Sequence, residues 1–169
     1  KNKYKIKNEI IGLRNIISNL LLSDKLDVPY SNLNLENTNF SHFLDKIIAK
    51  YPDPSSRITV KNSFPKINLN IDALKINIAI KNIIDNAFKY SLKSSDIIIH
   101  SYIKQGYVIV SINNQGNIIS EQDIEKIKNP FVRVNKDPSI QGFGLGLAIA
   151  NKIVLAHKGK LDIISTNND

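Results

Sequence analysis

The chain has 169 residues, of which 42% are hydrophobic, and carries a formal net charge of +8 at pH 7. This composition suits an ordinary globular core and excludes a disordered chain, and the absence of cysteine excludes a disulfide scaffold, a thiolate zinc site and a cysteine nucleophile. The lysines are scattered and no nucleic-acid motif is present, which indicates a solvated surface and no nucleic-acid partner. The sequence has no long apolar run and no signal peptide, which predicts a soluble fragment.

Residues 1–27 carry apolar side chains at alternating spacings of four and three. This spacing is typical of a coiled-coil seam, which a helix buries only against a partner. We therefore expect a seam helix over residues 1–30, a linker and first strand over residues 31–40, and a mixed helix-and-strand domain over residues 36–169. The seam residues are Ile6, Ile10, Leu13, Ile17 and Leu20.

The first half of this domain predicts two helices separated by two strands. A short helix is expected over residues 41–49 with Ser41 as its cap, followed by strands over residues 57–63 and 66–70 with a turn at Phe64–Pro65. Asp72 is expected to cap a long helix whose apolar residues pack against a sheet. Those residues are Leu74, Ile76, Ile78, Ile80, Ile83, Ile84, Ala87 and Phe88.

The second half predicts a hairpin, two helices and a final strand. Strands with helices gathered beside them indicate an α+β fold, a two-layer α/β sandwich. The expected elements are a hairpin of residues 96–103 and 106–112 across Lys104 and Gln105, a polar loop 113–117, a helix 120–128 capped by Ser120, a mobile loop 132–143, a helix 144–157 and a strand 160–165.

Four polar residues share one face of the long predicted helix. Asn82, Asn86, Lys89 and Tyr90 stand at i, i+4, i+7 and i+8, which places them on one side of an α-helix. An amide oxygen suits a hard cation such as Mg²⁺, and an ammonium group one turn away suits a phosphate. The face therefore predicts a polyanion with its metal ion, and a nucleoside triphosphate is the obvious candidate. For these residues alone, an exposed polar stripe is the alternative.

A glycine-rich loop enters the last predicted helix at residues 142–149, with the sequence Gly-Phe-Gly-Leu-Gly-Leu-Ala-Ile. Glycines let the backbone approach a ligand closely, and a helix N-terminus presents free N–H groups and a positive dipole to an anion. The pattern predicts a phosphate cradle, to which Lys89 would add the cation. A glycine-rich hinge is the alternative for the loop by itself.

Two further loops carry candidate ligands. Asn114 follows a predicted strand and could accept the exocyclic amine of adenine, with Gly116 leaving room for the ring. An ordinary Asn/Gly turn is the alternative for this loop. The run Pro-Phe-Val-Arg at residues 130–133 combines a rigid turn, an aromatic ring and a cation, and its alternative is a helix stop with one packed ring.

Residues 82–90, 114–119, 130–133 and 142–149 resemble, in order and spacing, the N, G1, F and G2 boxes of sensor histidine kinases. These kinases belong to the Bergerat-fold (GHKL) ATPases, with type II topoisomerase ATPase subunits, mismatch-repair ATPases and heat-shock chaperones. Lys-Tyr-Ser, Pro-Phe-x-Arg and Gly-Leu-Gly-Leu-Ala-Ile are similar to the kinase branch in particular. The resemblance covers about residues 5–165. It implies a Bergerat ATP-binding fold preceded by the second helix of the dimerisation and phosphoacceptor hairpin.

The resemblance implies roles on the phosphate side of the site. Asn86 resembles the Mg²⁺ ligand, Asn82 its partner close to the phosphates, and Lys89 the phosphate-binding lysine. Arg133 matches the F-box arginine, which is expected to contact phosphate or the neighbouring helical domain. Asn82, Lys89 and Arg133 are therefore the implied catalytic residues.

The resemblance also implies the nucleotide-binding residues of the adenine side and the glycine loop. Tyr90 is similar to the residue that lies against adenine, and Asn114 occupies the place of the adenine-reading Asp. The other implied cofactor-binding residues are Gly116, Ile119, Gly142, Gly144, Leu145, Gly146 and Leu147.

Three departures from the family pattern affect what is expected. Asn114 and Ile118 stand where the family has Asp and a second Gly, and because a neutral amide replaces a carboxylate we predict weakened ATP affinity, not its loss. His42, His100 and His157 lie outside any phosphoacceptor context and are expected to be structural or surface residues. The family ordinarily has one more strand, so the last strand is expected to be missing.

The resemblance implies the ATP-binding catalytic domain of a bacterial two-component sensor histidine kinase. ATP·Mg²⁺ would donate its γ-phosphoryl to a histidine outside this fragment, in cis or in trans, and the phosphoryl would pass to a response-regulator aspartate. Without that histidine, the fragment is not expected to phosphorylate itself. A homodimer is implied for the full-length protein, as is a cytoplasmic position within an inner-membrane sensor.

Three alternatives remain open from the sequence. A pseudokinase or nucleotide-sensing module would bind ATP without phosphotransfer, and the altered G1 box favours it. A topoisomerase- or mismatch-repair-type ATPase would hydrolyse ATP steadily, but the seam helix and Pro-Phe-x-Arg argue against it. A serine kinase of the anti-sigma type would not need the seam helix.

Overall fold

The computed structural model describes residues 33–51, 57–62, 66–134 and 142–166. Most of the seam helix expected over residues 1–27, the turn at Phe64–Pro65 and much of the loop expected over residues 132–143 lie outside the described residues. Within the described part of the chain, no helix is long and apolar enough to cross a membrane. Five positions nearer the N-terminus are also described and are helical: Ile10, Arg14, Ile17, Ser18 and Leu21.

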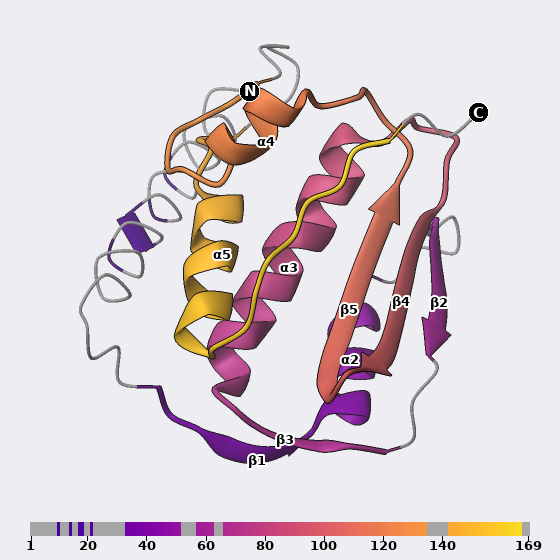
Figure 1. Cartoon of the computed structure of the whole chain (residues 1–169), viewed down its shortest axis with the longest axis vertical. Helices are drawn as coiled ribbons and strands as arrows, with labels where there is room; N and C mark the ends of the chain where they lie inside the picture. Colours follow the sequence, from indigo (N-terminus) through magenta and orange to yellow (C-terminus); the bar gives the residue numbers. More distant parts are fainter. Residues whose placement is uncertain are drawn as a thin grey trace.

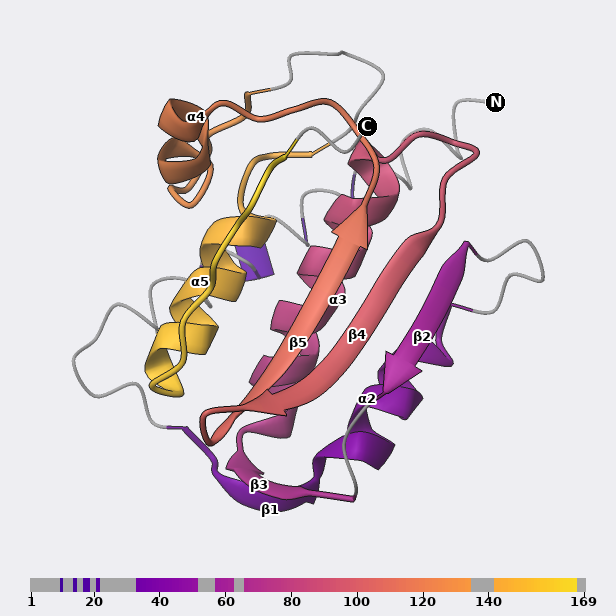
Figure 2. The ribbon, with the colours of Figure 1, turned by 45° about the vertical axis from the view of Figure 1, so that its right-hand side comes forward.

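The described elements form two layers, with strands in one and helices in the other. Figures 1 and 2 show α3 crossing one face of the sheet β2-β4-β5, with α5 beside it. This arrangement confirms the predicted α+β sandwich. In chain order the elements are β1 (Glu36–Asn39), α2 (Phe40–Ile48), β2 (Ile58–Asn62), β3 (Asn68–Ile71), α3 (Ala73–Tyr90), β4 (Ile97–Lys104), β5 (Tyr107–Asn114), α4 (Glu121–Lys126) and α5 (Gly146–Ala156).

Strand β4 is the central strand of the sheet, parallel to β2 and antiparallel to β5. The β4–β5 turn falls on Gln105 and Gly106, one residue later than predicted. Both residues have positive φ, 51° and 79° respectively, as tight hairpin turns require because their twist then matches that of the strands. Strands β1 and β3 form a separate antiparallel ribbon at the end of the molecule where α3 begins (Figure 1).

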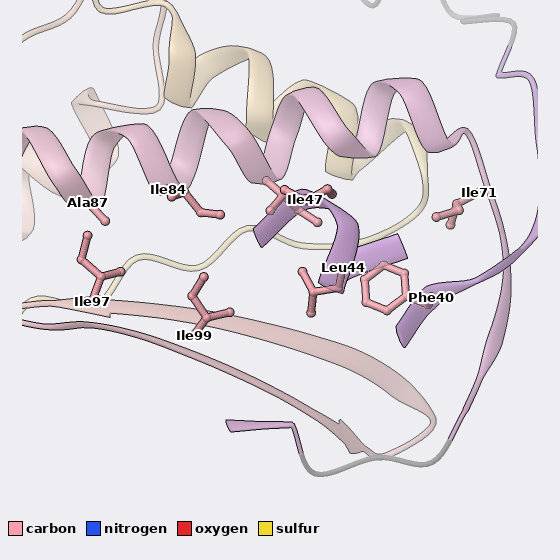
Figure 3. Close-up of a cluster of buried hydrophobic side chains, with 9 residues drawn as sticks. Phe40, Leu44, Ile47, Ile71, Ile84, Ala87, Ile97 and Ile99 are labelled. Carbon is pink, nitrogen blue, oxygen red and sulfur yellow. The ribbon is translucent and has the colours of Figure 1, made fainter. Parts of the chain in front are cut away.

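The main core lies between β4, α2 and α3 (Figure 3). Ile80, Ile84 and Ala87 recur at i, i+4 and i+7 and so form one stripe of α3. Ile97 and Ile99 alternate along β4 and face that stripe from the sheet. The core is completed by Phe40, Leu44 and Ile47 of α2 and by Ile71 of β3.

A second apolar cluster joins α3 to α5, so α3 buries two faces. The expectation that all its apolar residues pack against a sheet is therefore wrong: Ile83 packs against the α5 cluster, and Leu74 is 79% exposed. At 100° per residue, Leu74 lies roughly 120° around the helix axis from Ile80, away from the sheet. The buried members of the cluster are Ala79, Leu145, Ile149, Ala150 and Ile153.

Helix α2 begins one residue earlier than predicted, and Asn39 is its N-cap instead of Ser41. The side-chain oxygen of Asn39 accepts a hydrogen bond from the N–H of His42 (3.0 Å). The earlier start buries Phe40, whose N–H donates to the carbonyl of Ile67 (2.8 Å). Burial of this ring thus favours Asn39 over the equally suitable cap at position 41.

The strand predicted over residues 160–165 is wrong, because residues 159–166 are neither helix nor strand. Side-chain contacts hold this segment. Leu161 packs against the α5 cluster, and the hydroxyl of Ser165 accepts a hydrogen bond from the N–H of Ile119 (2.9 Å). Helix α5 begins at Gly146, two residues later than predicted.

Candidate functional site

The polar residues of α3 lie on its C-terminal half. Asn82 and Asn86 are half-buried, whereas Lys89 and Tyr90 are exposed. The side-chain nitrogen Nδ2 of Asn82 is buried and has no hydrogen-bond partner. Because leaving a buried polar group unsatisfied costs about 1–3 kcal/mol, such a donor indicates a place for an external acceptor.

The N-terminus of α5 lies against Asn82. A Cβ atom on Gly146 would stand 3.1 Å from Oδ1 of Asn82, so glycine permits this approach. The N-cap residue is Leu145, and no side chain caps the helix by a hydrogen bond. The first N–H groups of α5 are therefore available to an anion. Leu145 itself is 4% exposed, and its side chain packs in the α5 cluster, whereas Leu147 is half-buried.

The glycine segment before α5 reaches both Lys89 and the Pro-Phe-Val-Arg run. A Cβ atom on Gly142 would lie 3.7 Å from Nζ of Lys89. Gly144 has φ of +71°, and its Cβ would lie 2.7 Å from the Val132 carbonyl oxygen. The carbonyl oxygen of Gly144 accepts a hydrogen bond from the N–H of Phe131 (3.0 Å). Arg133, half-buried, follows one residue after Val132.

The predicted adenine loop lies against the end of α3. Gly116 forms an isolated bridge with Ser91, and its Cβ would fall 2.3 Å from the carbonyl oxygen of Tyr90. The N–H of Leu92 donates to the carbonyl of Gln115 (2.8 Å). Asn114, exposed, ends β5 at the same end of the molecule as the C-terminus of α3 and the start of α5 (Figure 1).

The opposite end of α3 is held by a buried carboxylate. Asp72, 3% exposed, is the N-cap as predicted, and its oxygens accept from the N–H and Nζ of Lys75 (3.0 and 2.5 Å) and from the N–H of Asn34 (3.1 Å). Burial by itself raises the pKa of Asp72, but these hydrogen bonds and the Lys75 charge outweigh it and hold the pKa below its usual value.

His157 follows α5 and completes this junction. The N–H of Asp72 donates to Nε2 of His157 (3.0 Å), so Nδ1 carries the proton and donates to the Ile153 carbonyl (2.8 Å). His157 is thus a structural residue, as expected, and connects the end of α5 to the start of α3.

A polar cavity of about 330 Å³ adjoins another face of α3, between α2 and α3, away from Asn82 and Asn86. There the Tyr51 hydroxyl donates to Asp85 (2.9 Å), and burial, with the Asp85 hydrogen bond and charge, raises the pKa of Tyr51. Its lining residues are Ile47, Lys50, Tyr51, Asn77, Lys81 and Asp85.

The structure brings together most of the residues that the motifs selected. Asn82 meets Gly146, Lys89 meets Gly142, and Tyr90 meets Gly116. Ser91 and Gln115 lie within the predicted motifs, but sequence reasoning gave them no role, whereas in the structure they connect these groups through the backbone. Backbone contacts leave no side-chain signature, so the sequence could not assign this role.

The comparisons with known proteins agree with the geometry. Residues 71–169 match the profile of the family described as "Histidine kinase-, DNA gyrase B-, and HSP90-like ATPase". The chain is 31% identical over 154 residues to the sensor protein kinase WalK of Staphylococcus aureus, a match that covers 86% of the chain and 37% of WalK. The chain thus spans little more than a third of that relative's length.

Two solved structures share the fold. The mycobacterial sensor histidine kinase MprB has a TM-score of 0.62 at 26% identity, covering 73% of this chain and 80% of that one. Full-length ShkA, solved in complex with AMPPNP, has a TM-score of 0.69 at 20% identity, covering 86% of this chain and 31% of that one.

The fold and its relatives define an ATP-binding catalytic domain of the histidine kinase type. The chain belongs to the family of histidine kinase-, DNA gyrase B- and HSP90-like ATPases. Its relatives are named sensor kinases, which supports the kinase branch over the topoisomerase, mismatch-repair and anti-sigma alternatives.

Proposed function

We propose that this chain binds ATP between the polar face of α3 and the glycine segment before α5, and presents its γ-phosphoryl group to a histidine outside residues 1–169. The observation that carries the proposal is the buried, unpartnered Nδ2 of Asn82 beside the uncapped N-terminus of α5. The unpartnered Asn82 amide group and the uncapped N–H groups of α5, whose first residue Gly146 lies against Asn82, suit an oxyanion such as a phosphate. Lys89 adds a cation near Gly142, four residues before the start of α5.

The phosphate-side residues would act by position and charge. The α5 N–H groups, the Asn82 amide and the Lys89 ammonium would orient the phosphates and offset their charge, which is most of what phosphoryl transfer asks of a protein. Arg133 would contact phosphate or the phosphoacceptor domain from the segment bonded to Gly144. Asn82, Lys89 and Arg133 are the catalytic residues of this proposal.

Magnesium fits the same site. Among the described residues no group of three His, Asp or Glu side chains could hold a metal ion. The resemblance to the kinase family implies the half-buried Asn86 amide as the protein ligand, together with phosphate oxygens. Mg²⁺ would supply charge neutralisation at the transferring phosphoryl group. Asn86 would orient the metal-bound nucleotide from the middle of the polar face.

The adenine side would be formed by the contact of Gly116 with Tyr90. Tyr90 would lie against the ring and Asn114 would accept the exocyclic amine. Ile119, whose N–H bonds to Ser165, would support the loop. The backbone of Gly142, Gly144, Leu145, Gly146 and Leu147 would close over the phosphates.

In the whole protein, the phosphoryl group would pass from that histidine to an aspartate of a response regulator. We propose that the whole protein is a homodimeric two-component sensor kinase with this domain in the cytoplasm, since its relatives are named sensor kinases. Labelled ATP should give an acid-labile phosphohistidine in the full-length protein and none in residues 1–169 alone. Labelling of His42, His100 or His157 would contradict this division of labour.

The binding site is tested by a matched pair of lysines on α3. Lys89→Gln removes the cation beside Gly142 and should weaken ATP·Mg²⁺ binding about tenfold or more, measured by titration calorimetry. Lys81→Gln removes an equally exposed lysine that lines the cavity on another face and should change the affinity less than about twofold. No heat of binding at millimolar ATP for the unsubstituted chain, or equal losses in both variants, would refute the site.

A nucleotide-sensing module without phosphotransfer is the second candidate. The exposed amide of Asn114 favours it, because an uncharged group would read adenine at the position where the resemblance to the kinase family implies a carboxylate. ATP binding by the full-length protein with no phosphohistidine would support this candidate over the kinase.

A further inference from the structure

Arg57, half-buried immediately before β2, reaches the chain segment beyond α3. Its Nη1 donates to the carbonyl oxygens of Leu92 and of Ser95 (3.0 Å for the latter). Its guanidinium carbon lies 5.6 Å from the centroid of the Phe88 ring. One side chain therefore contacts the last turn of α3 and the turn that follows it.

These contacts bracket two residues of the proposed site. Phe88 precedes Lys89 directly, and Leu92 follows Tyr90 by two residues. The Phe88 ring is also stacked on Tyr51, with centroids 5.8 Å apart and planes at 19°. The end of α3 that carries Lys89 and Tyr90 is thus held from the side away from the glycine segment.

The same contacts extend to the adenine loop. Leu92, whose carbonyl accepts from Arg57, donates its N–H to the Gln115 carbonyl (2.8 Å), and its neighbour Ser91 bridges Gly116. Among the described residues, this hydrogen bond and this bridge connect the 91–95 turn to the 115–116 loop. Arg57 therefore contacts Leu92, the residue of the turn that makes the hydrogen bond. A shift of Leu92 would move Gln115, and with it Asn114 and Gly116 on either side, relative to Tyr90.

Arginine suits this place for a chemical reason. A charged, planar guanidinium can donate to two carbonyls while one face lies against an aromatic ring, and a lysine ammonium cannot reproduce that combination. Its charge also lies near the C-terminal, negative end of the α3 dipole.

We infer that Arg57 is a positioning residue for the adenine side of the nucleotide site: it holds Tyr90 and the Asn114–Gly116 loop at their mutual spacing without touching the nucleotide. The inference rests on the proposed ATP site. The phosphate side depends less on Arg57, because Asn82 lies more than one helical turn before Phe88 and the N-terminus of α5 is on another helix.

The test separates base from phosphate recognition. Arg57→Gln should weaken ATP binding about tenfold, as expected when hydrogen bonds from a charged donor are lost. Inorganic tripolyphosphate has no base, so Arg57→Gln should bind it with the same affinity as Lys61→Gln does. Lys61→Gln is the matched control, since it removes one exposed positive charge from β2 and should leave ATP binding within about twofold. Arg57→Lys keeps the charge and is the more conservative change, so it should weaken ATP binding about threefold and leave tripolyphosphate binding unchanged.

The outcomes distinguish the inference from the proposed function. Equal affinities of Arg57→Gln and Lys61→Gln for ATP overturn the inference while the ATP site stands. Parallel losses for ATP and tripolyphosphate also overturn it, because they indicate general destabilisation. An unsubstituted chain that binds neither ligand overturns the proposed function and the inference with it.

Discussion

The buried carboxylate of Asp72 offers the sharpest stability prediction. Asp72→Asn keeps the shape of the side chain and its ability to cap a helix, since Asn and Asp are comparable N-caps. It removes the charge and puts an amide NH₂ where Oδ2 accepts from the Asn34 N–H (3.1 Å) and from Nζ of Lys75 (2.5 Å). The N–H of Asn34 and the Nζ of Lys75 would then both point at the new NH₂ group, which cannot accept their hydrogen bonds.

The expected cost follows from those contacts. A donor left unsatisfied beside a 3%-exposed side chain costs about 1–3 kcal/mol, and the partly buried pair with Lys75 adds on the order of 1 kcal/mol. We expect Asp72→Asn to lower the free energy of unfolding by about 3 kcal/mol at pH 7. For a chain of this size, that corresponds to a Tm lower by roughly 6–12 °C.

The pH dependence distinguishes the charge from the shape. The folded-state pKa of Asp72 is depressed, so its contribution is fully present above the unfolded-state pKa and is lost as the pH falls through the folded-state pKa. Urea unfolding of both proteins between pH 7 and pH 3 should therefore show a difference that shrinks towards the acid end. Asp162→Asn, at an exposed carboxylate paired with Lys160, should show little effect at any pH.

Two results would refute this reasoning. A difference between the unsubstituted chain and Asp72→Asn that stays constant from pH 7 to pH 3 would mean that the carboxylate charge is not the source of stability. A difference near zero at pH 7 would mean that the contacts with Asn34 and Lys75 contribute nothing in solution.

Two further substitutions test the site. Gly144→Ala places a Cβ 2.7 Å from the Val132 oxygen at a φ of +71°, so it should cost about 1–2 kcal/mol of strain. ATP binding measured by calorimetry should weaken severalfold. Unchanged binding would show that the Phe131–Gly144 contact is dispensable. Asn114→Asp restores a carboxylate facing the proposed adenine amine and should tighten ATP binding about tenfold; an equal gain for GTP would contradict adenine reading.

Local chemistry accounts for what the sequence predicted well. Asp72 caps α3 as expected because its carboxylate bonds to an N–H only three residues away. The β4–β5 hairpin was predictable because two runs rich in Ile, Val and Tyr flank a short polar turn, although the prediction placed that turn one residue too early. The polar face of α3 followed from helical periodicity, which fixes which residues share a side without knowledge of the partner.

Predictions failed where a distant contact decides between equal local signals. Asn39 and Ser41 are both good caps, and packing of Phe40 against the core selects the first. Residues 160–165 have a strand-like pattern, but a strand requires a partner for its backbone, and this segment is held by side chains instead. Leu74 fits the apolar pattern of α3 but faces away from both of its packing partners.

The amino-acid sequence by itself predicted most of the described helices, the hairpin and the family, because these depend on residue types and their spacing along the chain. Only the tertiary structure decided that Gly146 lies against Asn82, Gly142 against Lys89 and Gly116 against Tyr90. Those contacts join residues 26 to 64 positions apart, and burial of the α3 and α5 cluster brings the first two of them together. Spacing along a chain cannot encode a distance between elements whose packing is settled by a shared core.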